Sequence, residues 1–328
     1  MKMEEQLINY VKAGYPGVYI VSSEEARVEK VIKDMMSKLK KHKLFAWSAT
    51  EGVMEFPAVI QHKDTNDPYS LLTYMSKLPG NSIVLLRDFH LYIEDADPTL
   101  IRLLKDALYK GKAKGIQTVI LGCRQVLPPE LEKEFVVVNF TLPTKDDLNH
   151  VLDSLAKSVK TKDGKSLVVN GNREQILDSA MGLTTNEAEN AFALSLVEKK
   201  DFVPEVIAKE KSATIKKNGL LEVIEEPNSL DDIGGLELLK YWMKQRTNTF
   251  SKAAKKYRLP QPKGIMIVGV PGTGKSLTAK ATAKVLGRPL IKLDAGKIFA
   301  GLVGQSEGNM RSVIETAEAI APCVLWID

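Results

Sequence analysis

The feature that most constrains this chain is a glycine-rich segment, Gly269–Ser276, between an apolar run and a helical pattern. The run Gly264–Val268 before it has the composition of a buried strand, and Leu277–Leu286 after it that of a helix. Three glycines let the backbone of such a loop wrap around an anion, with N–H groups pointing inward at the positive end of the helix dipole. The order of strand, glycine loop and helix therefore predicts a phosphate-binding loop in an α/β fold.

The residue types in this loop match the chemistry of a nucleoside triphosphate. Lys275 would reach the β- and γ-phosphates, and the Ser276 hydroxyl would ligate magnesium. The predicted cofactors are therefore ATP and Mg²⁺. The predicted nucleotide-binding residues of the loop are Gly269, Pro271, Gly272, Thr273, Gly274, Lys275, Ser276 and Leu277.

A second apolar run, Cys323–Ile327, reads as a strand and is followed by Asp328. This carboxylate would hold the magnesium through water. A strand that ends in an acid is often only a core strand entering a loop, but here an amphipathic helical pattern over 309–320 precedes it. Lys275 and Asp328 are thus the candidate catalytic residues, and Ser276 and Asp328 the candidate metal ligands.

These segments together resemble the AAA family of ATPases, the clade of the FtsH proteases and proteasomal ATPases. The resemblance rests on the phosphate loop and on the segments 230–236, 304–307 and 321–328. Residues 293–307 are similar, more narrowly, to AAA-domain proteins encoded in algal plastids and cyanobacteria. The resemblance implies ATP hydrolysis at the subunit interfaces of a homo-oligomeric ring, a hexamer in this family, coupled to remodelling of a protein partner.

Two further sites are implied by the resemblance alone. Asp232, Ile233 and Gly234 would line the adenine pocket, although a turn that begins a helix explains the same residues. Leu302–Gly304 falls where hexameric unfoldases carry an aromatic pore loop. Leu302 stands in place of the aromatic residue, so an ordinary surface loop is an equal alternative.

The N-terminal part repeats the pattern without its chemistry. Gly17–Val21 reads as a strand and 24–39 as a helix, but Ser22 and Ser23 replace the glycine loop. Two glutamates open that helix, where carboxylates favour the helix dipole and would repel a polyphosphate. We therefore predict that this position binds no nucleotide.

The remaining periodicity defines the domain organisation. Further strands are expected at 82–88, 117–122 and 135–140, and helices at 146–159, 173–181 and 186–199. The predicted fold is α/β with two tandem P-loop modules of AAA type, of which the first is degenerate and carries a helical lid and the second is incomplete. The alternative is an unrelated α/β domain followed by a small bundle. The predicted boundaries are 1–142 for the degenerate domain, 143–217 for the lid, 218–229 for a linker and 230–328 for the N-terminal part of an ATPase domain.

The resemblance also implies parts that follow Asp328 in the family: a glutamate that polarises water, a sensor strand, an arginine finger and a lid. The AAA sheet has the order 5-1-4-3-2, so its fourth strand would separate 264–268 from 324–328. Without that strand we expect exposed apolar faces. We therefore expect a fragment that binds ATP poorly and does not turn it over, and a full-length parent that is an ATPase. The alternative is a non-hydrolysing, nucleotide-dependent scaffold.

The net charge of the chain is compatible with a nucleic-acid partner but does not by itself indicate one. The formal charge is +5, with lysine clusters at 38–43, 209–217 and 252–258. Solvated helix faces explain these clusters, and no aromatic side chains are interleaved to stack on bases. A DNA-associated ATPase or loader is therefore only an alternative to the protein remodeller.

Compartment and thiol chemistry follow from what the sequence contains. The acidic start Met1–Gln6 does not fit a signal peptide, and no run of about 18 apolar residues occurs, so we expect a cytoplasmic protein without a membrane segment. Cys123 and Cys323 each lie in an apolar run. We expect both to be buried, reduced thiols without a catalytic role.

Overall fold

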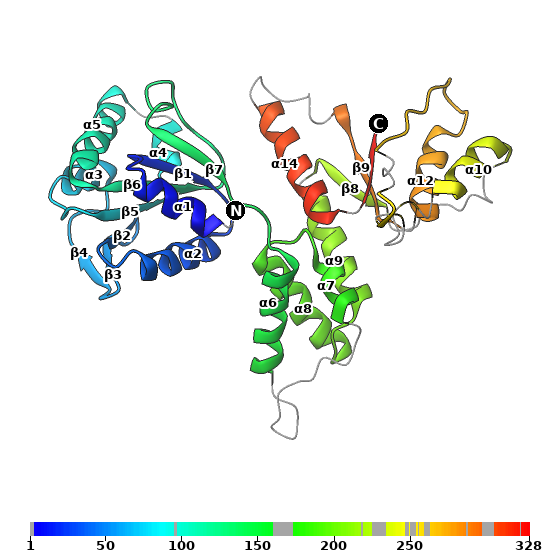
Figure 1. Ribbon diagram of the computed structural model, residues 1–328, viewed down its shortest axis with the longest axis horizontal. Coiled ribbons are helices and arrows are strands. Elements are labelled where there is room, and N and C mark those ends of the chain that lie inside the picture. The colour runs from blue at the N-terminus through cyan, green and yellow to red at the C-terminus, as the bar shows by residue number, and fades with distance from the viewer. Residues whose placement is uncertain are drawn as a thin grey trace. The chain divides into compact units, whose positions relative to one another are not determined.

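A seven-stranded sheet organises the N-terminal unit of the computed structural model (Figure 1). The strands are β1 (Gly17–Val21), β2 (Lys43–Ser48), β3 (Gly52–Phe56), β4 (Ile60–His62), β5 (Ser82–Arg87), β6 (Gln117–Gly122) and β7 (Phe135–Asn139), in the order β4-β3-β2-β5-β6-β1-β7. The five strands from β2 to β7 along this order pair in parallel, whereas β3 and β4 add an antiparallel edge. Taken by chain position, the parallel strands have the order 5-1-4-3-2 that the resemblance implies.

The structure describes most of the chain and divides it into two compact units, Met1–Thr141 and Leu142–Asp328. The described residues are 3–94, 97–159, 173–217, 219–224, 234–246, 249, 254, 256–258, 263–286, 288–296, 305–321 and 323–328. Among them, no helix has both the length and the apolar character that crossing a membrane requires.

Helices cover both faces of the N-terminal sheet, as expected for parallel strands with predominantly apolar residues. The helices are α1 (Met3–Lys12), α2 (Glu25–Lys38), α3 (Pro68–Met75), α4 (His90–Glu94) and α5 (Pro98–Lys114). Leu7 of α1 and Ile32 of α2 pack in the core on one face. Leu71 of α3, Ile93 of α4 and Leu104 of α5 pack in the core on the other, and Figure 1 shows these helices around the sheet. The unit is therefore a three-layer α/β/α sandwich.

Local sequence signals explain where several helices begin and end. Asp97 accepts hydrogen bonds from two backbone N–H groups of the first turn of α5, whose first residue is Pro98. Gly115 ends the same helix with a φ of +70°, in the left-handed region that favours glycine. Thr144 and Thr184 form capping boxes with Asp147 and Glu187 at the starts of α6 (Lys145–Ser158) and α8 (Thr185–Lys199).

Four helices open the second unit: α6 (Lys145–Ser158), α7 (Arg173–Ala180), α8 (Thr185–Lys199) and α9 (Pro204–Lys217). The helices predicted at 146–159, 173–181 and 186–199 correspond to α6, α7 and α8. Their apolar faces share one core that includes Leu152, Ile176 and Phe192. Residues of α9 also belong to this core, so the helical region extends to the end of α9.

The rest of the second unit contains β8 (Leu221–Ile224), α10 (Glu237–Arg246), α12 (Lys275–Leu286), β9 (Leu290–Leu293), α14 (Gln305–Ile320) and β10 (Val324–Ile327). β9 lies between β8, its antiparallel neighbour, and β10, its parallel neighbour. β8 falls inside the predicted linker, 218–229. Alternating Leu221 and Val223 pack in the same core as Ile291, which gives this short segment a place in the sheet.

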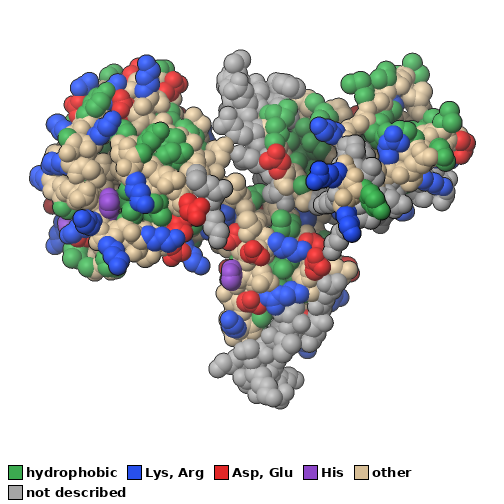
Figure 2. Space-filling model, in the orientation of Figure 1, with side chains coloured by type: hydrophobic (Ala, Val, Ile, Leu, Met, Phe, Trp, Pro, Cys, Tyr) green, Lys and Arg blue, Asp and Glu red, His purple; other side chains and the backbone are tan. Residues whose placement is uncertain are grey.

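One predicted strand is wrong. Gly264–Val268 has no regular structure, and the side chains of Met266 and Val268 are 89% and 86% exposed. A parallel strand needs a neighbour for its backbone hydrogen bonds, and among the described residues β10 pairs only with β9. These apolar side chains therefore face solvent in the structure. Hydrophobic side chains at the surface of this part of the chain are visible in Figure 2.

Candidate nucleotide-binding site

The glycine loop has the backbone conformation that its sequence requires. Gly272 and Gly274 have φ values of +84° and +83°, where a side chain would be strained. A Cβ atom added to Gly269 would lie 2.9 Å from Thr273 Oγ1, whose hydroxyl donates to the carbonyl of Val270 at 2.8 Å. Gly269 thus has little room for a side chain, whereas Gly272 and Gly274 have open space around them and are restricted by their left-handed backbone alone. A backbone of this kind can turn successive N–H groups towards an anion.

Lys275 is held by the loop that precedes it. Its Nζ atom donates to the carbonyl oxygens of Gly269 and Val270, each at 2.8 Å. The ammonium group therefore lies beside the loop backbone, within reach of any anion that the loop would hold. Ser276, the predicted metal ligand, is exposed in the first turn of α12. These residues fit a magnesium–polyphosphate group in donor chemistry and in backbone shape.

Helix α12 is anchored from its opposite side, which fixes where its N-terminus lies. Ala281 and Met243 of α10 are buried in one small cluster. The Thr282 hydroxyl contacts the Met243 sulfur at 3.6 Å and donates to the Thr278 carbonyl. The Thr278 hydroxyl in turn donates to the carbonyl of Gly274, the last loop residue, at 2.9 Å. The loop and the helix are thus joined by side-chain as well as backbone hydrogen bonds.

Asp328 lies at the end of β10, as predicted, but its partner is a residue that the sequence did not indicate. Its Oδ2 atom is 2.9 Å from Nζ of Lys292 on the neighbouring strand β9. The same ammonium lies 4.6 Å from the ring centre of Trp326. The hydrogen bond to Asp328 raises the pKa of Lys292. Among the described residues, no hydrogen bond or ion pair connects Asp328 to the glycine loop.

The other predicted residues are only partly within the described chain. Gly234 is exposed, with open space around its Cα atom. Asp232 and Ile233 lie outside the described residues, so the adenine pocket stays a prediction. Leu302–Gly304, the position of the pore loop, also lies outside them.

The corresponding position of the N-terminal unit is filled by ion pairs. Arg87 ends β5, and its guanidinium pairs with Glu29, with Glu51 at 3.1 Å and with Glu25 at 3.4 Å. At the end of β1 the Ser22 hydroxyl accepts from the backbone N–H of Glu24 at 3.0 Å. Carboxylates therefore stand at the carboxyl edge of this sheet, where the phosphates of a nucleotide would approach. The sequence predicted the acids after β1 but not the arginine that they surround.

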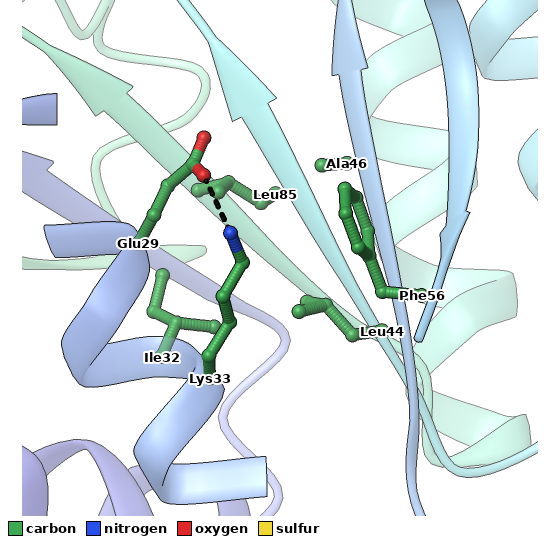
Figure 3. Close-up of a pocket in the computed structure, with 7 residues that line it drawn as sticks. All are labelled: Glu29, Ile32, Lys33, Leu44, Ala46, Phe56 and Leu85. Atoms are coloured by element: carbon green, nitrogen blue, oxygen red, sulfur yellow. Dashed lines mark hydrogen bonds and ion pairs between the residues drawn. The ribbon is translucent and has the colours of Figure 1, made fainter. Parts of the chain in front are cut away.

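A depression between α2 and the sheet of the N-terminal unit is too small for a nucleotide. It has a volume of about 180 Å³ and is lined by Ile32, Leu44 and Phe56 among others (Figure 3). The Lys33 ammonium crosses it to Glu29 at 3.2 Å. Ligand pockets usually measure roughly 300–1,000 Å³. The depression beside α2 is therefore not a nucleotide-binding cavity.

Three protein-family models match successive parts of the chain. Residues 3–140 match the N-terminal domain of SpoVK-like AAA ATPases, residues 146–218 match the second domain of the same proteins, and residues 265–328 match the ATPase family associated with various cellular activities (AAA). The last match contains both the glycine loop and Asp328.

Individual AAA proteins are also similar to this chain. The chain is 34% identical over 323 residues to the AAA domain-containing protein ycf46 of Guillardia theta, covering 97% of the chain and 62% of that protein. It is 35% identical to the protein of the same name of Gracilaria tenuistipitata var. liui, covering 95% and 63%. The ATP-dependent zinc metalloprotease FtsH of Burkholderia pseudomallei is 37% identical over 100 residues, 30% of the chain and 15% of the protease.

The chain spans somewhat less than two thirds of the length of these two ycf46 relatives. Its match to them runs through the N-terminal sheet, the helical region and the glycine loop alike. The sequence resemblance, the domain matches and the relatives all lead to one assignment: this chain belongs to the AAA ATPase family, with the domain arrangement of its SpoVK-like members.

Proposed function

We propose that this chain binds ATP with magnesium through residues 269–277, and that the protein to which these elements belong hydrolyses ATP to remodel a protein partner. The observation that carries the proposal is the glycine loop itself, with two left-handed glycines and Lys275 folded against its carbonyls at the start of α12. This arrangement supports phosphate binding because backbone N–H groups, a helix N-terminus and an ammonium group act on one anion.

Each residue has a role in this proposal. The backbone at Gly272 and Gly274 wraps the phosphates, Lys275 exchanges its loop carbonyls for phosphate oxygens, and Ser276 and Asp328 hold the metal ion. Magnesium, when bound, neutralises charge on the β- and γ-phosphates. For Asp328 to bind the metal ion, its carboxylate must leave its ion pair with Lys292. This pair is partly exposed, so opening it costs little free energy.

We also propose that the N-terminal unit is a degenerate AAA module that binds no nucleotide. Its strand order supports the common origin, and the ion pairs around Arg87 support the loss of the site. Such a unit is free to serve another purpose, such as holding a partner. Association of AAA modules into a ring belongs to the same proposal.

A protein partner is preferred to nucleic acid. The FtsH relative is an ATP-dependent zinc metalloprotease, an enzyme that acts on proteins. Among the described residues on the face shown in Figure 2, Lys and Arg side chains are scattered among acidic, hydrophobic and other side chains.

The nucleotide site can be tested with a fluorescent ATP analogue titrated against the whole chain in the presence of magnesium. Lys275→Ala should weaken binding at least about tenfold, because charge-assisted hydrogen bonds to the phosphates are lost. Lys280→Ala, on the same helix, is the matched control and should bind like the unmodified chain. Equal affinities for the two variants would refute the proposal.

A further inference from the structure

A carboxylate, an imidazole and a thiol lie together at the carboxyl edge of the N-terminal sheet and belong to no part of the glycine loop. Asp88 follows β5, Cys123 follows the neighbouring strand β6, and His90 begins α4. The backbone N–H of Asp88 donates to the carbonyl of Leu121 at 2.9 Å, so the ends of the two strands are fixed to each other. The carboxyl edge of parallel strands is where α/β proteins commonly place their reactive groups.

Cys123 differs from what its apolar surroundings in the sequence predict. β6 ends at Gly122, and Cys123 begins the turn that follows, so its side chain is exposed rather than buried. The thiol is thus open to reagents in solution. Cys323, the second thiol, is half-buried, and burial raises its pKa.

His90 contacts this thiol from the interior of the protein. It is only 1% exposed, and its Nε2 atom lies 3.6 Å from the Cys123 sulfur, within hydrogen-bonding distance. Its other ring nitrogen, Nδ1, is buried and has no hydrogen-bond partner among the residues that the structure describes. The nearest carboxylate oxygen, Asp88 Oδ1, is 3.9 Å from Nδ1.

The backbone around the imidazole is shaped to admit it. A Cβ atom on Gly122 would lie 2.5 Å from His90 Nδ1, so the ring occupies the space that a side chain at this position would fill. Asp88 has a φ of +53°, a conformation uncommon for residues other than glycine. Such conformations are often retained where they position a functional group.

The chemistry of the cluster favours a nucleophilic thiol. A thiolate is the reactive form of cysteine, and a neighbouring imidazole can take its proton. The described residues contain no group of His, Cys, Asp and Glu side chains arranged for a metal ion, so metal binding does not explain the cluster. Burial lowers the pKa of His90, so the imidazole is neutral, and the Asp88 carboxylate opposes this effect by favouring the protonated ring.

We propose that Cys123 is a site of thiol modification, with His90 as its base and Asp88 as the residue that offsets the charge of the protonated imidazole. The reactant is a low-molecular-weight disulfide. The Cys123 proton passes to His90 Nε2, the thiolate attacks one disulfide sulfur, and the second sulfur leaves as a thiolate that takes up a proton. One sulfur–sulfur bond forms as another breaks, so no separate oxidant is needed.

The test measures the rate at which each thiol of the whole chain reacts with 5,5′-dithiobis(2-nitrobenzoate), a disulfide whose leaving group absorbs light. Cys323→Ser reports Cys123 alone, and Cys123→Ser reports Cys323 alone. We expect Cys123 to react at least about tenfold faster than Cys323 in the folded chain, and the two rates to converge in denaturant. Equal rates in the folded chain would overturn the proposal.

His90→Gln in the Cys323→Ser background isolates the role of the imidazole. We expect a rate about tenfold lower at pH 7, with a smaller loss for Asp88→Asn, which keeps a residue that tolerates the left-handed backbone. His42→Gln is the control for loss of a partly buried histidine elsewhere in the unit. An unchanged rate in folded His90→Gln protein would contradict the assignment.

If His90→Gln does not fold, the pH dependence of the Cys123 reaction rate tests whether His90 acts as the base. The charged and titratable groups around His90 and Cys123 are Asp88, Glu94, Arg124 and Tyr19. With His90 as base, the Cys123 rate in folded Cys323→Ser protein should persist well below the usual thiol pKa of about 8.5 and fall as the imidazole becomes protonated. A single transition near the ordinary thiol value would overturn the proposal.

Discussion

Lys292 Nζ and Asp328 Oδ2 lie 2.9 Å apart on neighbouring strands, so the predicted metal ligand is paired with a cation of its own chain. The pair is partly exposed, with 29% and 51% of the two side chains accessible. Exposed pairs of this kind contribute at most about 1 kcal/mol, which a divalent cation can overcome. Lys292 therefore competes with the metal ion for Asp328 without preventing its binding.

Removal of that competitor gives the first prediction. Lys292→Gln should raise the apparent affinity for Mg²⁺ in the presence of ATP by up to about fivefold, the equivalent of roughly 1 kcal/mol. A magnesium titration of the fluorescent ATP complex measures it, with Lys284→Gln on α12 as the control. Weaker binding in Lys292→Gln would instead make Lys292 a nucleotide ligand.

The left-handed glycines give the second prediction. Gly272→Ala places a side chain at a φ of +84°, which costs about 1–2 kcal/mol if the loop keeps its shape. We expect at least about a fivefold loss of ATP affinity. Gly264→Ala is the matched control, because Gly264 has open space and no left-handed φ. Similar losses in both variants would show that the loop geometry does not determine binding.

The ion pairs around Arg87 give the third prediction. The Arg87 and Glu29 side chains are 15% and 14% exposed, so Arg87→Met takes the guanidinium away from a mostly buried carboxylate and leaves it paired with the half-exposed Lys33. We expect the free energy of unfolding of the N-terminal unit to fall by about 2–4 kcal/mol, with ATP affinity unchanged. Arg102→Met, which opens a more exposed pair with Asp106, should cost less than about 1 kcal/mol.

Denaturant unfolding followed by fluorescence of Trp47, in a background with the other two tryptophans replaced by phenylalanine, reports the N-terminal unit. A loss of ATP affinity in Arg87→Met would contradict the view that this unit binds no nucleotide. If Arg87→Met lowers the free energy of unfolding no more than Arg102→Met does, the ion pairs around Arg87 do not stabilise the unit beyond what an exposed pair contributes.

Two histidines give the fourth prediction, a dependence of stability on pH. Burial lowers the pKa values of His42 and His90 below the ordinary 6.5, so the unfolded unit binds more protons than the folded one as pH falls. The stability is fully present above about pH 6.5 and is lost as pH falls towards the folded pKa values. The free energy of unfolding should decrease between pH 7 and pH 5.5, and less so in the double variant His42→Gln, His90→Gln. Equal slopes for the two proteins would contradict this attribution.

The fold could be predicted where the signal is local. The apolar run Gly17–Val21 is buried between two parallel neighbours, so its composition alone predicts a strand. The capping residues likewise lie next to the helices that they begin. The glycine loop is local as well, since its spacing specifies the left-handed backbone at Gly272 and Gly274.

What could not be predicted depends on partners distant in sequence. β8 is a strand because β9 lies beside it, and Gly264–Val268 is irregular because no described strand pairs with it. The partners of Arg87 and Asp328 come from other elements, and nothing in their own segments indicates them. Cys123 was expected to be buried because its apolar run continues past the residue at which β6 ends.

The central claim, that the glycine loop holds the nucleotide and the edge of the N-terminal sheet does not, is tested most directly by hydrogen–deuterium exchange with and without ATP and magnesium. The account predicts slower amide exchange in peptides covering 269–278, lost in Lys275→Ala, and no change in peptides covering Ser22–Glu29. Slower exchange at Ser22–Glu29 without any change at 269–278 would contradict it.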